Sequence, residues 1–548
     1  MKKRFVLLFC VVAAFLAFSV TTPADRYFEI AKNLDIFATL FKEVNALYVD
    51  EVNPNKLVRT GIDAMLESLD PYTNYIPEDE VEDYRTMNTG QYGGIGAITR
   101  EIGDRTVVTM IMDGYGADKG GLKIGDEILK IDGIELSKLT REESSQLMKG
   151  QVGTTVNINI KRYGSDKPLD LQFKRERVKL NNVPFFGMVS EDIAYIHLSD
   201  FTPDAGKEVK NALADLREKG AKGVILDLRG NPGGLLIEAV NISNLFIPKG
   251  KLVVSTKGKI PENNLKYETL NNPLDTEIPV AVLINRGSAS ASEIVAGTLQ
   301  DYDRGVVLGE KSYGKGLVQV SRPLSYNSQL KVTTAKYYTP TGRCIQVLDY
   351  AHRRDDGSVE SIPDSIKRSF KTTHGRTVYD GGGIDPDIEI ENIDAHPLTQ
   401  VLIEKGFIFD FATAYVHKNP KAIDPRQFNL PDAEYQQFIS WMKGKDYSYK
   451  SYLEYGIQQL VEESKKEKYY PEVKSQLDQI STRLTESKKN ELMLYKDQIK
   501  RMLEQEIVAR HHFDRGRIES AFKSDNEVKK AIELLHDEAQ YKKVLNIQ

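Results

Sequence analysis

A serine and a lysine that stand 25 positions apart are the residues best suited to covalent chemistry in this sequence. Ser290 follows an apolar run at residues 280–284 and precedes a segment of helical character at residues 293–301. Lys315 lies between two glycines on a loop that comes after a second apolar run. A serine hydroxyl becomes a nucleophile when a base removes its proton, and lysine serves as that base in Ser-Lys pairs. The layout therefore predicts a serine nucleophile with a lysine base.

The surroundings of both residues fit this chemistry. The base acts as a neutral amine, and burial among apolar groups lowers the pKa of a lysine from its usual value of about 10.4. The glycines beside Lys315, followed by Leu317 and Val318, are compatible with a dry pocket. Because Ser290 stands at a predicted helix start, the amide of Ala291 is expected to point toward an oxyanion formed there.

Simpler interpretations exist for each residue alone. Residues 290–293 also read S-x-x-E, the pattern of a capping box at a helix start. A lone lysine in a loop is usually a surface residue. Taken singly, both residues are better explained in this structural way, and the chemical interpretation rests on the whole stretch from residue 280 to residue 320.

That stretch resembles the C-terminal processing peptidases, also called tail-specific proteases. The resemblance is carried by GSASASEIVAG at residues 287–297 and by YGKGLVQ at residues 313–319. It implies that Ser290 is the nucleophile, that Lys315 is the general base and that Gln319 orients the lysine.

Residues 179–393 are predicted to form the protease core. Strand-like runs at residues 194–198 and 224–228 alternate with helical segments at residues 204–219 and 235–246. Such alternation indicates βαβ units with functional loops at the strand ends. The resemblance implies that this α/β core is crotonase-like.

A glycine-rich loop, RGNPGG at residues 229–234, follows the second of these strands. The resemblance implies that a glycine amide of this loop completes the oxyanion hole together with the amide of Ala291. Gly233 and Gly234 remain alternatives for this donor. A tight strand-to-helix turn would need the same glycines without any catalytic role.

Residues 89–178 resemble a PDZ domain. The opening glycines and their neighbours could present backbone amides in a flexible loop to the carboxylate of a peptide C-terminus; these residues are Gly93, Gly94, Ile95 and Gly96. Residues 120–133 match the PDZ core pattern, and residues 140–149 read as the helix that flanks the peptide groove. The family resemblance implies that the peptide partners have apolar C-termini.

Composition narrows the range of partners and cofactors. The net charge of −5 gives no basic field for nucleic acid. The eight histidines show no zinc-binding spacing, so we predict neither a metal nor a cofactor. Of the two cysteines, Cys10 falls in the N-terminal leader, and no disulfide framework is expected.

The N-terminus predicts export. Residues 1–24 begin with three basic side chains and continue as an apolar run, as in a signal peptide. In a bacterial cell the destination would be the periplasm, with the chain either released or anchored in the membrane and facing the periplasm. Residues 25–88 follow as a helical region.

Residues 394–548 are predicted to be a C-terminal helical region rich in lysine, glutamate and tyrosine. Apolar residues recur there at helical spacing between residues 492 and 507. The family resemblance covers about residues 27–393 and is weak or absent in this region. A solvated helical cap is the favoured interpretation, and packing on the core and self-association are left open.

The sequence thus predicts a multidomain α/β protein with a crotonase-like protease core, an upstream PDZ domain and helical N- and C-terminal regions. Its predicted function is that of an exported serine endopeptidase that binds protein C-terminal tails and forms an acyl-enzyme. Two alternatives remain, a non-catalytic PDZ scaffold or chaperone and an acyl-CoA enzyme of the crotonase type. The signal peptide and the PDZ segment speak against the second.

Overall fold

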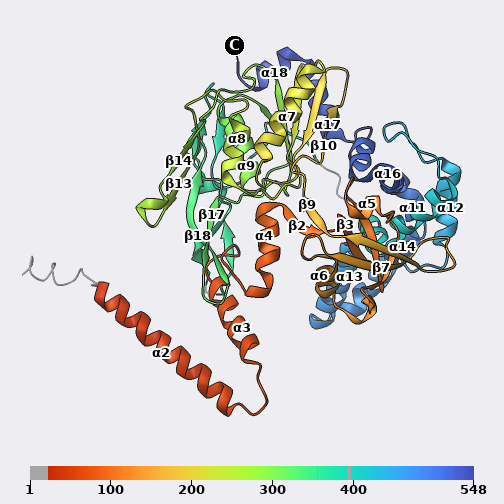
Figure 1. The fold of residues 1–548 in the computed structure, drawn as a ribbon, viewed down its shortest axis with the longest axis horizontal. Coiled ribbons are helices and arrows are strands. Elements are labelled where there is room, and N and C mark those ends of the chain that lie inside the picture. The colour runs from red at the N-terminus through yellow and green to blue at the C-terminus, as the bar shows by residue number, and fades with distance from the viewer. Residues whose placement is uncertain (1–22, 355, 392–395, 548) are drawn as a thin grey trace, which may run out of the picture. The chain divides into compact units, whose positions relative to one another are not determined.

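The computed structural model describes residues 23–354, 356–391 and 396–547 (Figure 1). The chain forms two units, one that ends at Tyr75 and one that begins at Ile76. The leader predicted at residues 1–24 lies outside the described residues except for its last two, which begin a helix. Within the described ranges, no helix combines the length and the apolar character that a membrane crossing requires.

The first unit consists mainly of two helices, α2 (Pro23–Leu47) and α3 (Pro54–Glu67). The start of α3 is set by Asn53, whose side chain accepts a hydrogen bond from Lys56 N at 3.1 Å, and by a proline at the first helical position. The helical region predicted for residues 25–88 is therefore divided, because its last helix, α4 (Val81–Thr89), belongs to the second unit.

The PDZ domain is an antiparallel sheet with one flanking helix, α6 (Arg141–Met148). The sheet order is β3-β4-β5-β7-β8, with the bounds β3 (Ala97–Ile102), β4 (Arg105–Ile111), β5 (Glu127–Ile131), β7 (Thr155–Lys161) and β8 (Leu169–Lys174). The short strand β6 (Ile134–Glu135) pairs with β5, and α5 (Gly116–Lys119) precedes it in the chain. The helix predicted at residues 140–149 is confirmed, and Thr140 caps it by accepting a hydrogen bond from Glu143 N.

The protease core is built on a six-stranded sheet in the order β10-β11-β12-β15-β16-β23. The bounds are β10 (Phe185–Met188), β11 (Ile193–His197), β12 (Gly223–Asp227), β15 (Val280–Ile284), β16 (Val306–Gly309) and β23 (Ile388–Glu389). Strand β10 is antiparallel to β11, and the remaining pairs are parallel. The apolar runs in the sequence are these parallel strands, which are buried on both faces.

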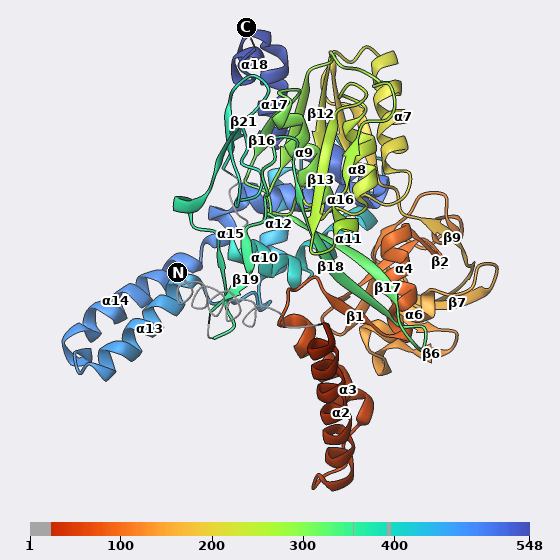
Figure 2. The same cartoon turned by 90° about the vertical axis from the view of Figure 1, so that its left-hand side faces the viewer.

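Two different sets of helices cover the two faces of this sheet. One face packs against α7 (Ala205–Glu218), α8 (Leu236–Ser243) and α9 (Ala291–Asp301). The other packs against α17 (Asn526–His536) and α18 (Glu538–Val544). In Figure 2, β12 is drawn between α17 on its left and α7 and α8 on its right. Helices α17 and α18 are thus a layer of the core. The core predicted from the sequence ends at residue 393 and does not include them.

A second sheet and several short hairpins flank the core. In this sheet β17 (Leu317–Pro323) pairs with β18 (Gln329–Tyr338), which also pairs with β13 (Leu252–Gly258), and β13 pairs with β14 (Lys266–Glu268). The hairpins are β19 (Leu348–Arg353) with β20 (Val359–Ser361), and β21 (Ser369–Lys371) with β22 (Thr377–Tyr379). Strand β17 leads directly out of the lysine loop.

Five of the other C-terminal helices form their own apolar core. They are α10 (Pro397–Glu404), α11 (Phe407–Lys418), α12 (Asp432–Met442), α15 (Glu491–Leu494) and α16 (Lys496–Ala521). Between α12 and α15 in the chain, α13 (Tyr452–Lys466) and α14 (Tyr470–Lys488) pack against each other. The stripe predicted between residues 492 and 507 faces this core, where Ile499, Leu503 and Ile507 are fully buried.

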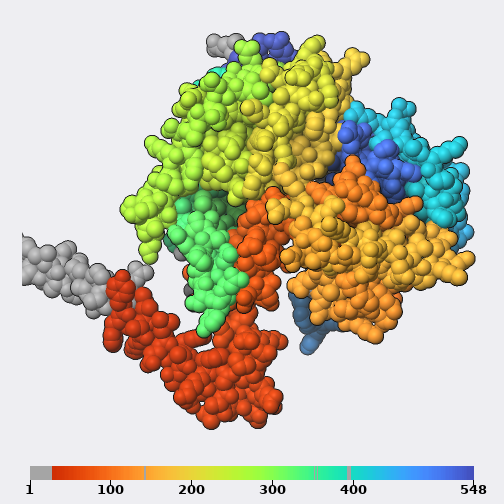
Figure 3. Space-filling model, viewed as in Figure 1, coloured from red at the N-terminus to blue at the C-terminus, as the bar shows by residue number. Residues whose placement is uncertain are grey.

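The C-terminal helices also pack against the PDZ domain. Phe409 joins the apolar cluster of the PDZ sheet, and Arg105 forms an ion pair with Asp410 at 2.8 Å. Figure 3 shows the blue surface of the C-terminal helices beside the orange surface of the PDZ domain. These helices bury apolar side chains against two neighbouring domains, so the structure has the packing on the core that the sequence left open and not the solvated cap that it favoured.

Candidate active site

Ser290 sits on a sharp turn between β15 and α9. Its backbone has φ 55° and ψ −111°, a conformation that residues other than glycine rarely adopt. Hydrogen bonds fix the turn, because Asn285 Oδ1 accepts from Gly287 N at 3.0 Å and from Gly230 N at 2.9 Å. Strain of this kind persists where the surroundings over-determine the backbone, and it is concentrated at functional sites.

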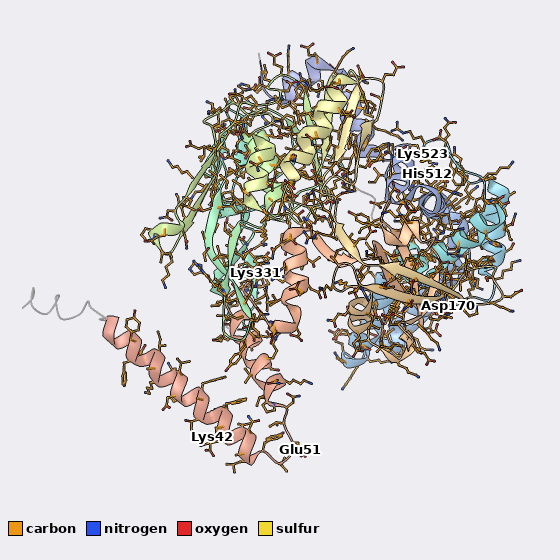
Figure 4. All side chains as sticks on the ribbon, viewed as in Figure 1. Lys42, Glu51, Asp170, Lys331, His512 and Lys523 are labelled. Atoms are coloured by element: carbon orange, nitrogen blue, oxygen red, sulfur yellow. The ribbon has the colours of Figure 1, made fainter. Side chains whose placement is uncertain are left out.

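The predicted catalytic residues line one cavity of about 350 Å³. Ser290, Lys315 and Gln319 contribute to its wall together with both glycines of the predicted oxyanion loop, Gly233 and Gly234. The rest of the wall mixes apolar and polar side chains, among them Tyr84, Met87, Asp200, Ile294, Val318, Lys331 and Tyr337. Lys331, labelled in Figure 4, comes from β18. The fold therefore brings together residues from six separate stretches of the sequence.

The loop that carries Lys315 depends on its two glycines. A Cβ on Gly314 would lie 2.0 Å from Val347 Cγ2, and Gly314 has a φ of +84°. A Cβ on Gly316 would lie 2.8 Å from Gln346 N. Gly314 is therefore required by its positive φ and by the Val347 side chain, and Gly316 by the close approach of the Gln346 backbone. Lys315 itself is half-buried.

Gln319 lies on β17 next to an irregularity in its pairing with β18. The register of the two strands shifts between Val318 and Gln319, as at a β-bulge, which re-aims the side chains around it. Gln319 Nε2 donates to Thr333 Oγ1 of β18 at 3.2 Å. The glutamine is thus held at the cavity wall by its neighbour strand, and its effect on Lys315 stays a prediction.

Glu293 joins the serine turn to the lysine loop. Its side chain is fully buried, and Oε2 accepts from Ser290 N at 2.7 Å and from Lys315 N at 2.9 Å. Oε1 accepts from Gly314 N at 2.7 Å and from Ser312 Oγ at 2.6 Å. Burial raises the pKa of Glu293, although these hydrogen bonds oppose the shift. The S-x-x-E pattern identified this residue as a local cap and gave no sign of its contacts with the lysine loop.

The predicted oxyanion donors lie beside the serine. Ala291 begins α9, so its N–H has no acceptor within the helix. The backbone of Gly233 packs directly on this turn, because a Cβ there would lie 2.8 Å from Ala291 N and 2.9 Å from Ser290 Cβ. Gly233 N, however, already donates to Asn231 Oδ1 at 2.9 Å. Gly233 is buried and Gly234 is exposed to the cavity.

Asn231 ties this loop to the serine turn. Its carbonyl oxygen accepts from Ala289 N at 3.0 Å and from Ser292 Oγ at 2.9 Å. Its side-chain amide donates to Leu198 O at 2.7 Å. The two halves of the predicted oxyanion hole are thereby held in a fixed relation to each other.

The predicted carboxylate-binding residues of the PDZ domain are more ordered than expected. Gly93 and Gly94 end strand β2 (Gln91–Gly94), which pairs with β9 (Glu176–Lys179), so they lie in a ladder and not in a flexible loop. Ile95 is buried, and Gly96 has a φ of +78° with Tyr115 packed against it. Pairing with β9 orders the backbone of Gly93 and Gly94, which the sequence pattern alone predicted to be a flexible loop.

Across the described parts of the chain, no group of three or more histidine, cysteine, aspartate or glutamate side chains could hold a metal ion. Cys344 is partly buried, and burial raises the pKa of its thiol. A raised pKa leaves the thiol protonated and unreactive near neutral pH.

Comparison with known proteins agrees with this arrangement. The family model of peptidase family S41 matches residues 192–349, and that of the PDZ domain matches residues 93–173. A third model, described as the C-terminal helical domain of a probable PDZ-protease, matches residues 398–535. The expectation that the resemblance fades beyond residue 393 is therefore wrong.

Individual relatives point the same way. A carboxy-terminal-processing protease of Bartonella bacilliformis is 40% identical over 336 residues, which are 60% of this chain and 76% of the relative. A probable CtpA-like serine protease of Staphylococcus aureus is 35% identical over 317 residues, 57% of this chain and 62% of the relative. Among solved structures, a photosystem II D1 C-terminal processing protease aligns with a TM-score of 0.35 at 26% identity, covering 65% of this chain and 92% of its own.

The family models and the two curated relatives define a serine-type protease that carries a PDZ domain, the kind of domain that binds peptide C-termini. The chain belongs to the carboxy-terminal-processing proteases of peptidase family S41. Membership of this family favours the protease over the non-catalytic scaffold and the acyl-CoA enzyme.

Proposed function

We propose that this chain is an exported endopeptidase that captures the C-terminal tails of proteins and cleaves them with a Ser290–Lys315 pair. The observation that carries the proposal is the shared cavity, which collects Ser290, Lys315 and the oxyanion loop. The strained backbone of Ser290 and the carboxylate of Glu293 between serine and lysine support it.

The mechanism follows from the positions of these groups. Ser290 Oγ attacks the carbonyl carbon of the scissile peptide bond while the neutral amine of Lys315 takes the hydroxyl proton. The oxyanion that forms is held by the amide of Ala291 and by a glycine amide of the loop. Gly234 is the better candidate of the two glycines, because the amide of Gly233 is engaged with Asn231. Lys315 then gives its proton to the leaving amine, and water hydrolyses the acyl-enzyme.

The PDZ domain is proposed to select the substrate. The backbone from Gly93 to Gly96 would receive the terminal carboxylate, and an extended tail would lie between β3 and α6 as an added strand. An apolar final side chain would fit between these elements, because Leu139 before α6 and Leu147 within it pack against the apolar cluster of the domain.

Two further features belong to the proposal. The alternation of parallel strands and helices around the central sheet supports a crotonase-like core. The basic start and apolar run of residues 1–24 support export to the periplasm, either released or held at the membrane.

The test is cleavage of an unfolded protein that ends in an apolar tail, compared with the same protein without the tail. Ser290→Ala and Lys315→Ala are each expected to lower kcat by roughly 10⁴-fold or more. Lys311→Ala is the matched control, since this lysine of the same loop pairs with Asp385 at the surface. Removal of the tail is expected to raise KM. Cleavage that survives in Ser290→Ala would remove Ser290 from the role of nucleophile.

A further inference from the structure

Arg229 opens the oxyanion loop and is enclosed by three carboxylates. Its guanidinium contacts Asp227 through Nη2 at 2.5 Å and through Nε at 3.0 Å. On its other side Nη2 donates to Asp525 Oδ2 at 2.8 Å, and Nη1 donates to Glu527 Oε2. Asp227 lies at the end of β12, whereas Asp525 and Glu527 begin helix α17, some 300 residues further along the chain.

The cluster is largely withdrawn from water. The side chains of Asp227 and Glu527 are 3% and 5% exposed, and that of Arg229 is 18% exposed. Charged groups in such surroundings interact strongly and need partners on every side. Burial lowers the pKa of an isolated guanidinium, but the neighbouring carboxylates raise the pKa of Arg229 well above its usual value. The guanidinium therefore stays charged and fixed between the two elements.

Arg229 is connected to the oxyanion loop through the backbone. Its own N–H donates to Asp227 Oδ1 at 2.9 Å. The next residue, Gly230, donates to Asn285 of the serine turn at 2.9 Å, and Asn231 follows with its contacts to Ala289 and Ser292. A rotation or shift of Arg229 would therefore move the loop relative to Ser290.

We infer that Asp525 and Glu527 are positioning residues for the oxyanion hole, acting through Arg229 from the last part of the chain. They hold the side of the guanidinium that faces away from Asp227 and so fix the backbone of residues 229–234 beneath Ser290. This inference rests on the proposed function, because it concerns the same oxyanion.

The carboxylates are not what attaches helix α17 to the core. That contact is made by apolar side chains, Val528, Ala531 and Leu534, which pack on the sheet. Asp525 is also the N-cap of α17, since its Oδ1 accepts from Glu527 N and Val528 N at 3.0 Å. Its second oxygen is the one that binds Arg229. The capping role and the positioning role therefore use different atoms and can be separated.

The experiment compares kcat and KM of the full chain with those of Asp525→Asn, Glu527→Gln and the double variant. Asparagine caps a helix as well as aspartate does, so Asp525→Asn removes the charge and keeps the cap. Glu533→Gln is the matched control, because the carboxylate of Glu533 is exposed on the same helix and pairs with Lys530 at 3.1 Å, away from Arg229.

Each charge variant is expected to lower kcat about tenfold, and the double variant more, with KM almost unchanged. An indirect displacement of the oxyanion donors should cost less than loss of a donor itself, which lowers kcat by about 10²–10³. The control should keep the wild-type kcat. Wild-type kcat in both charge variants would overturn the inference, as would a loss of kcat that only follows the folded fraction measured by thermal unfolding.

A second readout separates positioning from general damage. A peptide aldehyde forms a tetrahedral adduct with an oxyanion, whereas the corresponding peptide alcohol only occupies the cleft. The charge variants should bind the aldehyde less tightly by the same factor as kcat falls and should bind the alcohol as the wild type does. Equal losses for both ligands would overturn the inference. If Ser290→Ala binds the aldehyde as tightly as the wild type does, the proposed function fails and the inference falls with it.

Discussion

The two faces of the central sheet are covered by helices of different origin. Helices α7, α8 and α9 come from the segments that connect the strands, so each lies close in sequence to the strand it covers. Helices α17 and α18 come from the end of the chain and cover the opposite face. Alternate residues of the same strands serve the two layers, as the pleat of a strand requires.

Both layers contact the loops that surround the cavity at Ser290. Helix α9 supplies the serine turn and Glu293 from the local side. Helix α17 supplies the carboxylates around Arg229 from the remote side. Helices from the C-terminal part of the chain can therefore position a loop at the end of a strand far away in the sequence.

Loss of the cation between the layers should have the largest effect on stability. Arg229→Gln leaves Asp227 buried without its partner, and breaking a buried ion pair in this way is expected to lower the free energy of unfolding by about 3–5 kcal/mol. The measurement is urea-induced unfolding.

The same variant should reverse the way in which Asp227 makes the free energy of unfolding depend on pH. Burial alone would raise the pKa of Asp227, but the charge and hydrogen bonds of Arg229 bring it below the usual value. In the wild type this contribution to stability is present above the ordinary pKa of aspartate and is lost as the pH falls through the lowered one. Without Arg229, burial raises the pKa, and acidification should instead stabilise the variant. The measurement is urea-induced unfolding of both proteins at several pH values. If the free energy of unfolding changes with pH in the same way in the wild type and in Arg229→Gln, this account is contradicted.

Two leucines test whether the layers contribute equally. Leu213 of α7 and Leu534 of α17 are both buried against the sheet, at 0% and 3% exposure. Leu213→Ala and Leu534→Ala are each expected to lower the free energy of unfolding by about 2–5 kcal/mol, through lost burial and a residual cavity. Leu494→Ala, at an exposed position, is the control. If Leu534→Ala behaves like this control, the remote layer is only loosely attached.

Glu293 tests the local layer at the catalytic site. In Glu293→Gln one oxygen becomes an NH₂ group that faces two hydrogen-bond donors, so we expect a loss of about 1–3 kcal/mol in the free energy of unfolding. Because the same carboxylate positions the backbone of Ser290 and Lys315, kcat should fall by about 100-fold. The check is kcat together with thermal unfolding, and a folded variant with wild-type kcat would refute the linking role.

The smallest expected effect concerns the edge of the remote layer. Tyr541 OH of α18 accepts from Val280 N at 2.9 Å and donates to Val280 O at 3.1 Å. Tyr541→Phe removes both contacts and should cost about 1 kcal/mol of the free energy of unfolding. Hydrogen exchange at the Val280 amide should become faster, whereas Tyr452→Phe, at an exposed position, should leave it unchanged. No change at Val280 would mean that α18 adds little to the start of strand β15.

Local sequence patterns were sufficient for several elements. The apolar run at residues 280–284 is strand β15, and the segment that reads as a helix after Ser290 is α9. The glycines around Lys315 are required by close contacts with Val347 and Gln346 and, at Gly314, by a positive φ, in keeping with the tight turn inferred for them. These features depend on residues that are neighbours in the chain, so their signal lies within one short window.

Other features left no local signal. Helix α9 is buried on every side, so an amphipathic stripe could not show which neighbours it has. Glu293 looks like a helix cap, and its second set of partners comes from a loop about 20 residues away. The hydrogen bond from Gly233 to Asn231 depends on the exact turn that the loop adopts, which the glycine pattern does not specify.

The sequence by itself determined the family, the PDZ and peptidase segments, and which serine and lysine to examine, because these are carried by residue types at fixed spacing. Only the tertiary structure decided that the chain's last helices complete the core and that Asp525 and Glu527 meet Arg229. Helical periodicity shows that one side of a helix is apolar but does not identify the surface that covers it. Which distant surfaces meet is settled by packing of the whole chain.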